Sequence, residues 1–219
     1  MAHREFKDRL YPEFARVAQA LGSDRRLELV DLLSQAPRRV EALATETGMT
    51  LANVSQHLQV LKNARLVESE RRGTAVVYRL ATPAVTSLWL ALRSVAAERL
   101  PEIGRLRQDF SDGGDDREIP RKEIQRLLKQ GDAVLVDVRP AMEFDHGHVA
   151  GAISIPIEDL ETRIKQLPRD KRIVAYCRGK YCLFADEAVA LLRKRGFDAV
   201  RLEGGWPEWA SEGRPVGKR

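Results

Sequence analysis

The 219-residue chain has little cysteine, and its apolar residues never form a long run. Two cysteines are too few for a disulfide framework, and in a reducing compartment they favour reactive or regulatory thiols. No stretch approaches the roughly 18 apolar residues that a membrane helix needs. The first residues, MAHREFKDRLYPEF, are charged throughout and lack the apolar core of a secretory signal. We therefore expect a cytoplasmic protein that does not enter the membrane.

The chain also lacks internal repeats, and its length suits two domains of about 100 residues each. Residues 1–107 contain 17 Lys and Arg against 12 Asp and Glu, whereas residues 108–219 contain 20 of each. The whole net charge of +5 therefore lies in the first half. This excess fits a nucleic-acid-binding half, although an ordinary solvated surface explains so small an excess equally well.

The stretch QDFSDGGDDREIP, residues 108–120, separates two different sequence patterns. Adjacent glycines and clustered acids without an apolar period predict a linker. Helical patterns dominate before it, and short apolar strands alternate with helices after it. We expect a mainly α domain over residues 1–107, a linker over 108–116 and an α/β domain over 117–219.

Apolar residues recur at helical spacing in five segments of the first half. They predict helices over residues 5–21, 23–35, 40–47, 51–64 and 82–106. The first helix could instead begin at Pro12, since proline favours helix starts. The third and fourth are joined by a turn at Gly48, and Thr50 is suited to cap the fourth, which is a helix-turn-helix pattern. Residues 66–80 alternate around a tip at residues 71–73, which predicts a β-hairpin, or wing.

The first half resembles the ArsR-type winged-helix repressors over about residues 18–80, on the phrases ALGSDRRLELVDLL, LATETGMTLANVSQHLQVLKNARLV and RRGTAVVYRL in this order. The part that ends in Ser55, His57, Leu58 and Leu61 carries most of the resemblance. The resemblance implies a transcriptional repressor and a homodimer joined through the first and last helices. Metal-sensing residues usual in the family are absent, because the first helix of the motif has no cysteine and the last helix has neither histidine nor aspartate.

The second helix of the motif should enter the major groove of DNA with its N-terminal residues nearest the bases. Asn and Gln read adenine, Ser and Thr contact bases or phosphates, and arginines in a wing suit phosphates or the minor groove. The candidate DNA-binding residues are Thr50, Asn53, Ser55, Gln56, His57, Gln59, Arg71 and Arg72. Each could be an ordinary solvated side chain, and His57 could pack inside the motif, but the intact motif favours DNA contact for the set. The expected partner is a near-palindromic double-stranded operator.

The second half predicts an α/β domain with a mostly parallel sheet. Its expected strands are AVLVDVR, GAISIP, RIVAYC and AVRL. The third leads into CRGKYC, residues 177–182, which holds both cysteines of the chain. Because sites in such sheets form where loops leave the carboxyl ends of strands, this loop lies where a site is expected.

The second half resembles the rhodanese domain over most of residues 115–213, on the phrases LVDVRPAMEFDHGHVAGAISIP, IVAYCRGKYC and LEGGWPEW. The resemblance implies transfer of a sulfane sulfur through a persulfide on Cys177. The loop departs from the commonest form, since glycine is third rather than fourth and the sixth residue is Cys182 rather than arginine. The sulfur donor, thiosulfate or a persulfide, therefore stays open. Leu183 stands where a related phosphatase loop needs arginine, which argues against phosphatase chemistry.

A cysteine between a strand and a helix N-terminus faces backbone N–H groups and the positive end of the helix dipole, which favour the nucleophilic thiolate on Cys177. Arg178 and Lys180 add positive charge for an anionic donor, and Gly179 lets the backbone curl. Cys182 either attacks a persulfide on Cys177 and leaves a disulfide, or only packs. A third reading is a soft metal or metalloid bound by both thiolates.

Other polar residues of the second half are interpreted as structural. Asp137 and Arg139 are expected to pair and brace the loop, and the resemblance makes the segment with His146 and His148 a structural turn. No cofactor or metal is expected.

Three functions follow from the sequence. The leading hypothesis is a dimeric DNA-binding repressor whose rhodanese domain senses or transfers reactive sulfur. The first alternative is a sulfurtransferase enzyme with a DNA-binding domain that is independent of sulfur. The second alternative is a repressor that senses a metalloid or soft metal through its two thiols.

Overall fold

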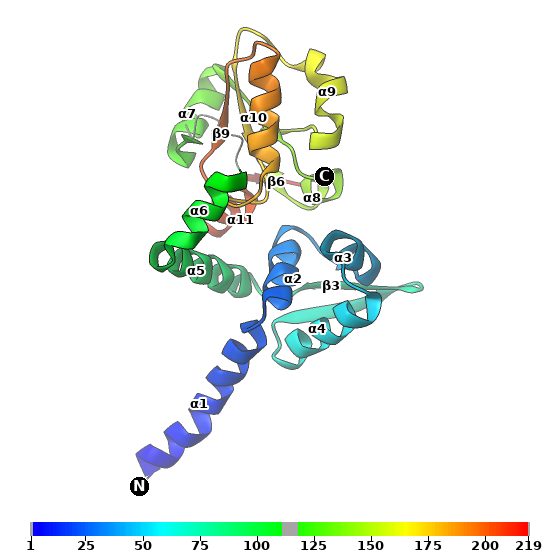
Figure 1. Cartoon of the computed structure of the whole chain (residues 1–219), viewed down its shortest axis with the longest axis vertical. Helices are drawn as coiled ribbons and strands as arrows, with labels where there is room; N and C mark the ends of the chain where they lie inside the picture. Colours follow the sequence, from blue (N-terminus) through cyan, green and yellow to red (C-terminus); the bar gives the residue numbers. More distant parts are fainter. Residues whose placement is uncertain (1, 111–117, 219) are drawn as a thin grey trace. The chain divides into compact units, whose positions relative to one another are not determined.

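The computed structural model describes residues 2–110 and 118–218, and the chain divides into two compact units, Met1–Ala91 and Leu92–Arg219 (Figure 1). The boundary between the units lies inside helix α5 (Pro83–Arg99). The predicted linker over 108–116 overlaps the end of helix α6 (Pro101–Phe110), and its other residues lie outside the described part. The predicted domain bounds therefore stay a prediction. Within the described ranges, no helix has the length and apolar character needed to cross a bilayer.

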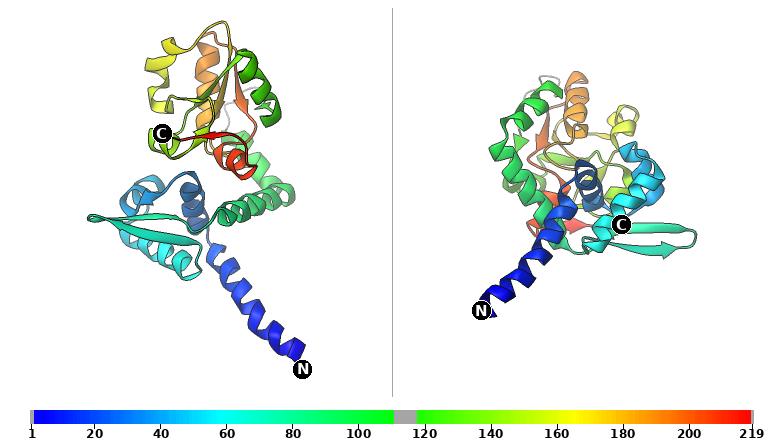
Figure 2. Two further views of the ribbon diagram at one scale, coloured as in Figure 1. Left: turned by 180° about the vertical axis from the view of Figure 1, so that it is seen from behind. Right: turned by 60° about the horizontal axis from the view of Figure 1, so that its bottom comes forward.

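The first unit is a winged helix-turn-helix fold, as the sequence predicted. Before α5 its elements are α1 (Ala2–Leu21), α2 (Asp24–Gln35), β1 (Arg38–Arg39), α3 (Val40–Thr47), α4 (Leu51–Asn63), β2 (Val67–Arg72) and β3 (Ala75–Leu80). The strands form an antiparallel sheet in the order β1-β3-β2. Figure 2 shows the β2–β3 hairpin extending as a long wing beyond the helices of this unit.

Proline is involved in both helix boundaries that differ from the predicted ones. Helix α1 runs through Pro12 instead of beginning there. Most of its side chains around this point are exposed, so water can satisfy the carbonyl that proline leaves without a partner. The single helix predicted over 82–106 is two helices, α5 and α6. Pro101 causes the break, because it lacks the N–H that a continuous helix needs and disfavours a helical residue before it.

The turn between α3 and α4 is built from local sequence signals. Gly48 ends α3 in the left-handed region, with a φ of 66° that glycine adopts without a steric penalty. Thr50 then caps α4, since its hydroxyl oxygen accepts a hydrogen bond from the backbone N–H of Asn53 at 3.3 Å. Fully buried leucines and valines from α2, α3 and α4, among them Leu29, Leu43 and Leu58, form the core below this turn.

The second unit is an α/β fold. Its elements after α5 are α6, β4 (Glu118–Ile119), α7 (Arg121–Gln130), β5 (Ala133–Asp137), α8 (Ala141–His146), β6 (His148–Val149), β7 (Ile153–Ser154), α9 (Leu160–Arg163), β8 (Arg172–Tyr176), α10 (Phe184–Lys194), β9 (Ala199–Leu202), α11 (Trp206–Ser211) and β10 (Val216–Gly217). Five strands form a parallel sheet in the order β4-β9-β8-β5-β7, and β6 pairs with β10 in a small antiparallel sheet. The four predicted strands correspond to β5, β7, β8 and β9. The two-residue strands β4, β6 and β10 were not predicted.

Side-chain alternation along β8 divides the core of the second unit in two. Ile173 and Ala175 face one apolar cluster, which α10 and α9 cover. Val174 and Tyr176 face the other, which α7 and α11 cover. Because successive side chains of a strand point to opposite faces, the next residue, Cys177, returns to the α10 side. The thiol of Cys177 therefore lies in an apolar core.

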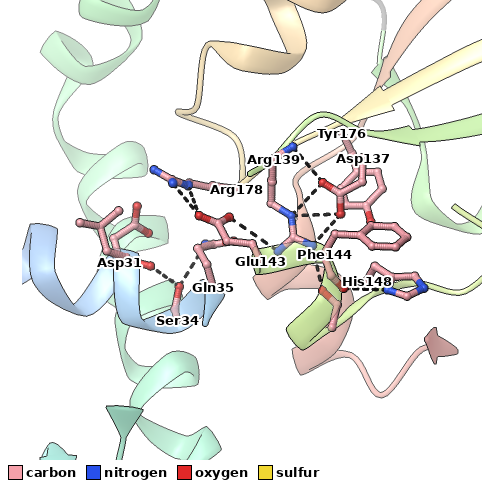
Figure 3. A network of polar contacts seen from close by, with 12 residues as sticks. Asp31, Ser34, Gln35, Asp137, Arg139, Glu143, Phe144, His148, Tyr176 and Arg178 are labelled. Atoms are coloured by element: carbon pink, nitrogen blue, oxygen red, sulfur yellow. Dashed lines mark hydrogen bonds and ion pairs between the residues drawn. The ribbon is translucent and has the colours of Figure 1, made fainter. Parts of the chain in front are cut away.

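Asp137 and Arg139 form the predicted pair at the end of β5, and both are fully buried. The Arg139 guanidinium donates to Asp137 Oδ2 at 2.6 Å and to the carbonyl oxygen of Gly147 at 2.8 Å (Figure 3). It also lies over the ring of Tyr176, the residue before Cys177, at 5.7 Å. The pair thus fixes the chain segment from which the thiol loop starts.

We expect Asp137→Asn to lower the free energy of unfolding of the second unit by about 3–5 kcal/mol, because it leaves a buried guanidinium without its main counter-ion. Urea denaturation followed by tryptophan fluorescence measures this, since Trp206 and Trp209 are buried in this unit. The control is Asp198→Asn, whose partner Arg172 is 43% exposed, and which should cost less than about 1 kcal/mol. Equal effects of the two substitutions would contradict the prediction.

Candidate thiol loop and nucleic-acid interface

The CRGKYC loop connects the end of β8 to the N-terminus of α10. Cys177 is fully buried, and Cys182 is half-buried. A backbone hydrogen bond of 3.2 Å from the N–H of Cys182 to the carbonyl of Gly179 curls the loop. Gly179 has a φ of 143°, which favours glycine at the third position of the loop.

The predicted LEGGWPEW phrase packs directly against the loop. A Cβ on Gly205 would lie 2.3 Å from the backbone nitrogen of Gly179 and 2.4 Å from the carbonyl oxygen of Cys177, so no larger residue fits there. The N–H of Trp206 donates to that same Cys177 carbonyl at 3.1 Å. This close approach of two backbones explains why the phrase contains glycine where it meets the loop.

The two thiols have opposite electrostatic environments. The Cys177 thiol donates toward the carbonyl oxygens of Cys182, at 3.3 Å, and Gly179, at 3.8 Å. Burial raises the pKa of Cys177 well above its ordinary value, and a side-chain hydrogen bond to the Cys182 sulfur raises it further. This hydrogen bond between the two side chains, assisted by backbone groups of Arg178 and Phe184, lowers the pKa of Cys182 to about 7. Cys182 is therefore the more acidic thiol of the pair.

The direction of this shift in pKa differs from the expectation that the loop favours a thiolate on Cys177. Alternation along β8 places that sulfur in the apolar cluster below the loop, and the cost of desolvating an anion outweighs the N–H groups of the loop. Cys182 lies closer to the start of α10 and keeps partial access to solvent.

The two predicted loop cations, Arg178 and Lys180, have different surroundings. Arg178 is paired with the buried carboxylate of Glu143, at 2.5 Å from Nη2 to Oε1, so its charge is largely compensated (Figure 3). Lys180 is exposed and remains a candidate for attracting an anionic donor. The pairing of Arg178 with Glu143 could not be predicted, because 35 residues separate them.

Sequence reasoning missed two further arginines at the loop. Arg201 on β9 is 3% exposed and donates to the carbonyl oxygens of Gly179 and Lys180, each at 3.2 Å. Arg93, in the part of α5 that belongs to the second unit, pairs with Glu208 at 3.0 Å and lies over the ring of Tyr181 at 5.3 Å. Arg201 could have been found in the sequence as an arginine inside the otherwise apolar strand AVRL. The sequence holds no comparable signal for Arg93.

His146 ends helix α8, and His148 begins strand β6. His148 stacks on Phe144 with ring centroids 3.7 Å apart, and its Nδ1 lies 2.8 Å from the carbonyl oxygen of the same residue. Burial lowers the pKa of His146. Within the described residues, no three His, Cys, Asp or Glu side chains are grouped so that they could hold a metal ion.

The predicted DNA-binding residues gather on α4 and the wing. Val54, Leu58 and Leu61 anchor α4 in the core of the first unit. The candidates on the remaining faces of α4, at its N-cap and in the wing are exposed, apart from the half-buried His57: Thr50, Asn53, Ser55, Gln56, Gln59, Arg71 and Arg72. Intramolecular contacts occupy several of them, such as the 3.0 Å pair between Arg72 and Glu70. DNA contact by each residue stays a prediction.

The two units together define a class of protein: a winged-helix DNA-binding fold joined to an α/β domain with a thiol loop. The model described as "Bacterial regulatory protein, arsR family" matches residues 23–69, and the "Rhodanese-like domain" model matches residues 120–212. The HTH-type transcriptional regulator Rv0324 of Mycobacterium tuberculosis is 44% identical over 210 residues, which cover 96% of this chain and 92% of that protein. The chain therefore belongs to the ArsR family of DNA-binding transcriptional regulators, and a rhodanese domain forms its C-terminal part.

Two further similarities each concern one part of the chain. A sulfurtransferase of Allochromatium vinosum is 33% identical over 93 residues, which cover 42% of this chain and 85% of that protein. A solution structure of a homodimeric winged helix-turn-helix DNA-binding domain from Mycobacterium bovis is 47% identical, with a TM-score of 0.42, and covers 43% of this chain and 87% of that one.

Replacing both Arg71 and Arg72 by alanine should weaken DNA binding about equally for all sequences. If each side chain contacts one phosphate, the slope of log affinity against log salt should fall by about two. Fluorescence anisotropy over a salt series measures the slope. The control is Arg25→Ala on α2, an arginine that is also exposed and paired with a glutamate. An unchanged slope in the double variant would show that the two arginines at the wing tip do not contact DNA phosphates.

Cys182 should be alkylated faster than Cys177 at neutral pH, with a rate that rises through about pH 7. Because the Cys177 thiol donates the hydrogen bond that stabilises the Cys182 thiolate, Cys177→Ala should move this midpoint to higher pH. Iodoacetamide labelling and peptide mass spectrometry measure both rates. In the Cys182→Ala control, Cys177 should react only at distinctly higher pH. Preferential labelling of Cys177 at neutral pH would refute the assignment.

Proposed function

We propose that this ArsR-type regulator is a dimeric repressor whose rhodanese domain responds to reactive sulfur. The observation that carries the proposal is the Cys177–Cys182 pair, two thiols whose side chains are hydrogen-bonded to each other. A family member that only transferred sulfur would need one loop thiol. A second thiol in contact with the first provides an internal acceptor that can change the loop itself.

The proposed chemistry needs no outside oxidant beyond the sulfur donor. The Cys182 thiolate first takes up the proton of Cys177, and the Cys177 sulfur attacks the terminal sulfur of a persulfide or polysulfide. The sulfur–sulfur bond of the donor breaks, and the rest of the donor leaves as a thiolate. This thiolate then takes the proton from Cys182. Cys177 now carries the persulfide. The Cys182 thiolate attacks the inner sulfur of this persulfide, hydrosulfide leaves, and a Cys177–Cys182 disulfide remains.

Exposed apolar side chains support the dimer in this proposal. On α1, Phe6, Tyr11 and Phe14 are each 60% exposed, and on α5 Val95 is also 60% exposed. Large apolar side chains gathered on a helix and open to solvent favour an interface with a second copy. These are the helices through which the resemblance to the family implies that subunits join.

Helix α5 is the element through which a change in the thiol loop would affect the winged-helix unit. Its first part belongs to the first unit, where Trp89 donates to Asp31 at 2.6 Å, and its second part belongs to the second unit, where Arg93 pairs with Glu208 and covers Tyr181. Closing a disulfide must rearrange the loop that holds Tyr181. We infer that Arg93 transmits this change to α5.

Binding to the DNA upstream of the gene that encodes this chain tests the proposal, at fixed salt, with reduced protein and with protein treated with polysulfide. We expect the treatment to weaken binding at least about tenfold, a coupling of about 1.4 kcal/mol. Cys177→Ser should abolish the response. Arg93→Gln should keep disulfide formation but lose the response, whereas Arg99→Gln, on the exposed surface of the same helix, should keep both.

The outcomes separate the alternatives. Unchanged DNA affinity together with steady turnover of thiosulfate or a persulfide would favour a sulfurtransferase that acts independently of DNA binding, which the similarity to the Allochromatium sulfurtransferase supports. A response to arsenite or cadmium that is lost in Cys182→Ser would favour the dithiol metalloid sensor. Mass spectrometry of Cys182→Ser should find the persulfide on Cys177.

A further inference from the structure

Arg201 is a buried cation in the middle of an otherwise apolar strand. Its side chain is 4% exposed and forms ion pairs with Asp186 of α10 at 2.7 Å and Glu118 of β4 at 3.2 Å. Glu118 is shared with Arg107, at 3.4 Å. The two arginines and two carboxylates of this cluster therefore balance in charge. A buried arginine of this kind persists only when its partners compensate the cost of desolvation.

The same guanidinium also holds the thiol loop. Its Nη2 donates to the carbonyl oxygens of Gly179 and Lys180, each at 3.2 Å. A trans peptide directs its carbonyl and its N–H to opposite sides. By holding two successive carbonyls of the loop, Arg201 on β9 therefore fixes where the N–H groups of Lys180 and Tyr181 point. The orientation of these donors in the loop depends on a residue outside it.

We propose that Arg201 is a positioning residue of the thiol loop, which orients its backbone and stabilises negative charge on the Cys177 sulfur. The sulfur chemistry that this residue would assist rests on the proposed function, whereas its effect on the thiol does not. Arg201 is also a source of positive charge that lowers the pKa of Cys177 against the effect of burial.

The other charged groups around the loop have known positions, so the effect of Arg201 can be isolated. They are Arg93 on α5, paired with Glu208 on α11, Arg178 in the loop, paired with Glu143 on α8, the exposed Lys180, Cys182, and Asp186 on α10. Cys182→Ser removes the other thiol, and the remaining groups stay constant across the variants below.

The test uses the full chain with Cys182→Ser, in which Cys177 is the single cysteine. Ultraviolet absorbance of the thiolate is titrated against pH, with the protein that lacks both cysteines as the blank. Arg201→Met should raise the midpoint by about one pH unit, a tenfold change in the ionisation constant. Arg201→Lys should restore part of this shift. Asp186→Asn should lower the midpoint, since it leaves the charge of Arg201 less compensated.

The two substitutions are expected to move the titration midpoint in opposite directions, which distinguishes an effect of the Arg201 charge from a general loosening of the loop. If Arg201→Met and Asp186→Asn moved the midpoint in the same direction, or if Arg201→Met left it unchanged, the proposal would be overturned. Arg172→Met on β8, whose partner Asp198 is 59% exposed, is the matched control and should have no effect. If circular dichroism shows Arg201→Met unfolded, Arg201→Lys and Asp186→Asn still decide.

The titration contains no sulfur donor, so its result does not depend on the proposed function. Predicted shifts together with a DNA affinity that ignores polysulfide would refute sulfur sensing and leave the role of Arg201 intact. A DNA affinity that responds to polysulfide, together with unchanged titration midpoints, would refute the role of Arg201 and leave sulfur sensing intact.

Discussion

Side-chain alternation along β8 is the constraint on which the thiol site depends. Ile173 and Ala175 face the α10 side of the sheet, so Cys177, the residue that follows the strand, faces it too. Cys177 therefore meets an apolar core, and its thiolate is costly to form. Of the groups around Cys177, the hydrogen bond with Cys182 adds to this cost, whereas the positive charge of Arg201 and the backbone of Gly179 reduce it.

The charges around the loop are compensated one by one. Arg178 has Glu143, Arg93 has Glu208, and Arg201 has Asp186 and Glu118. Exposed charge therefore contributes little to holding an anion here, apart from Lys180, because a paired arginine presents mainly a dipole to its surroundings.

The sequence predicted the two folds and the position of the loop because these depend on local signals. Gly48 and Thr50 mark the helix-turn-helix, and apolar runs mark β5, β8 and β9. The break at Pro101 was readable from proline chemistry but was outweighed by the apolar period across it. The acidity of the two thiols was not predictable, because it depends on burial and on contacts made across the fold. The same holds for Arg93, whose partner Glu208 is 115 residues away in the chain.

The presence of cysteine at both ends of the loop changes what a sulfur reaction leaves behind. With one thiol, a persulfide persists until an outside acceptor removes its sulfur, and the loop itself is unchanged between turnovers. In the reaction proposed for this chain, the second thiol displaces hydrosulfide and a disulfide closes the loop across residues 177–182. The closed loop cannot keep the hydrogen bond from the Cys177 thiol to the Cys182 carbonyl, since the proton is gone. A rearranged loop would change its contacts with every element packed against it, and α5 is one of these elements because Arg93 contacts Tyr181.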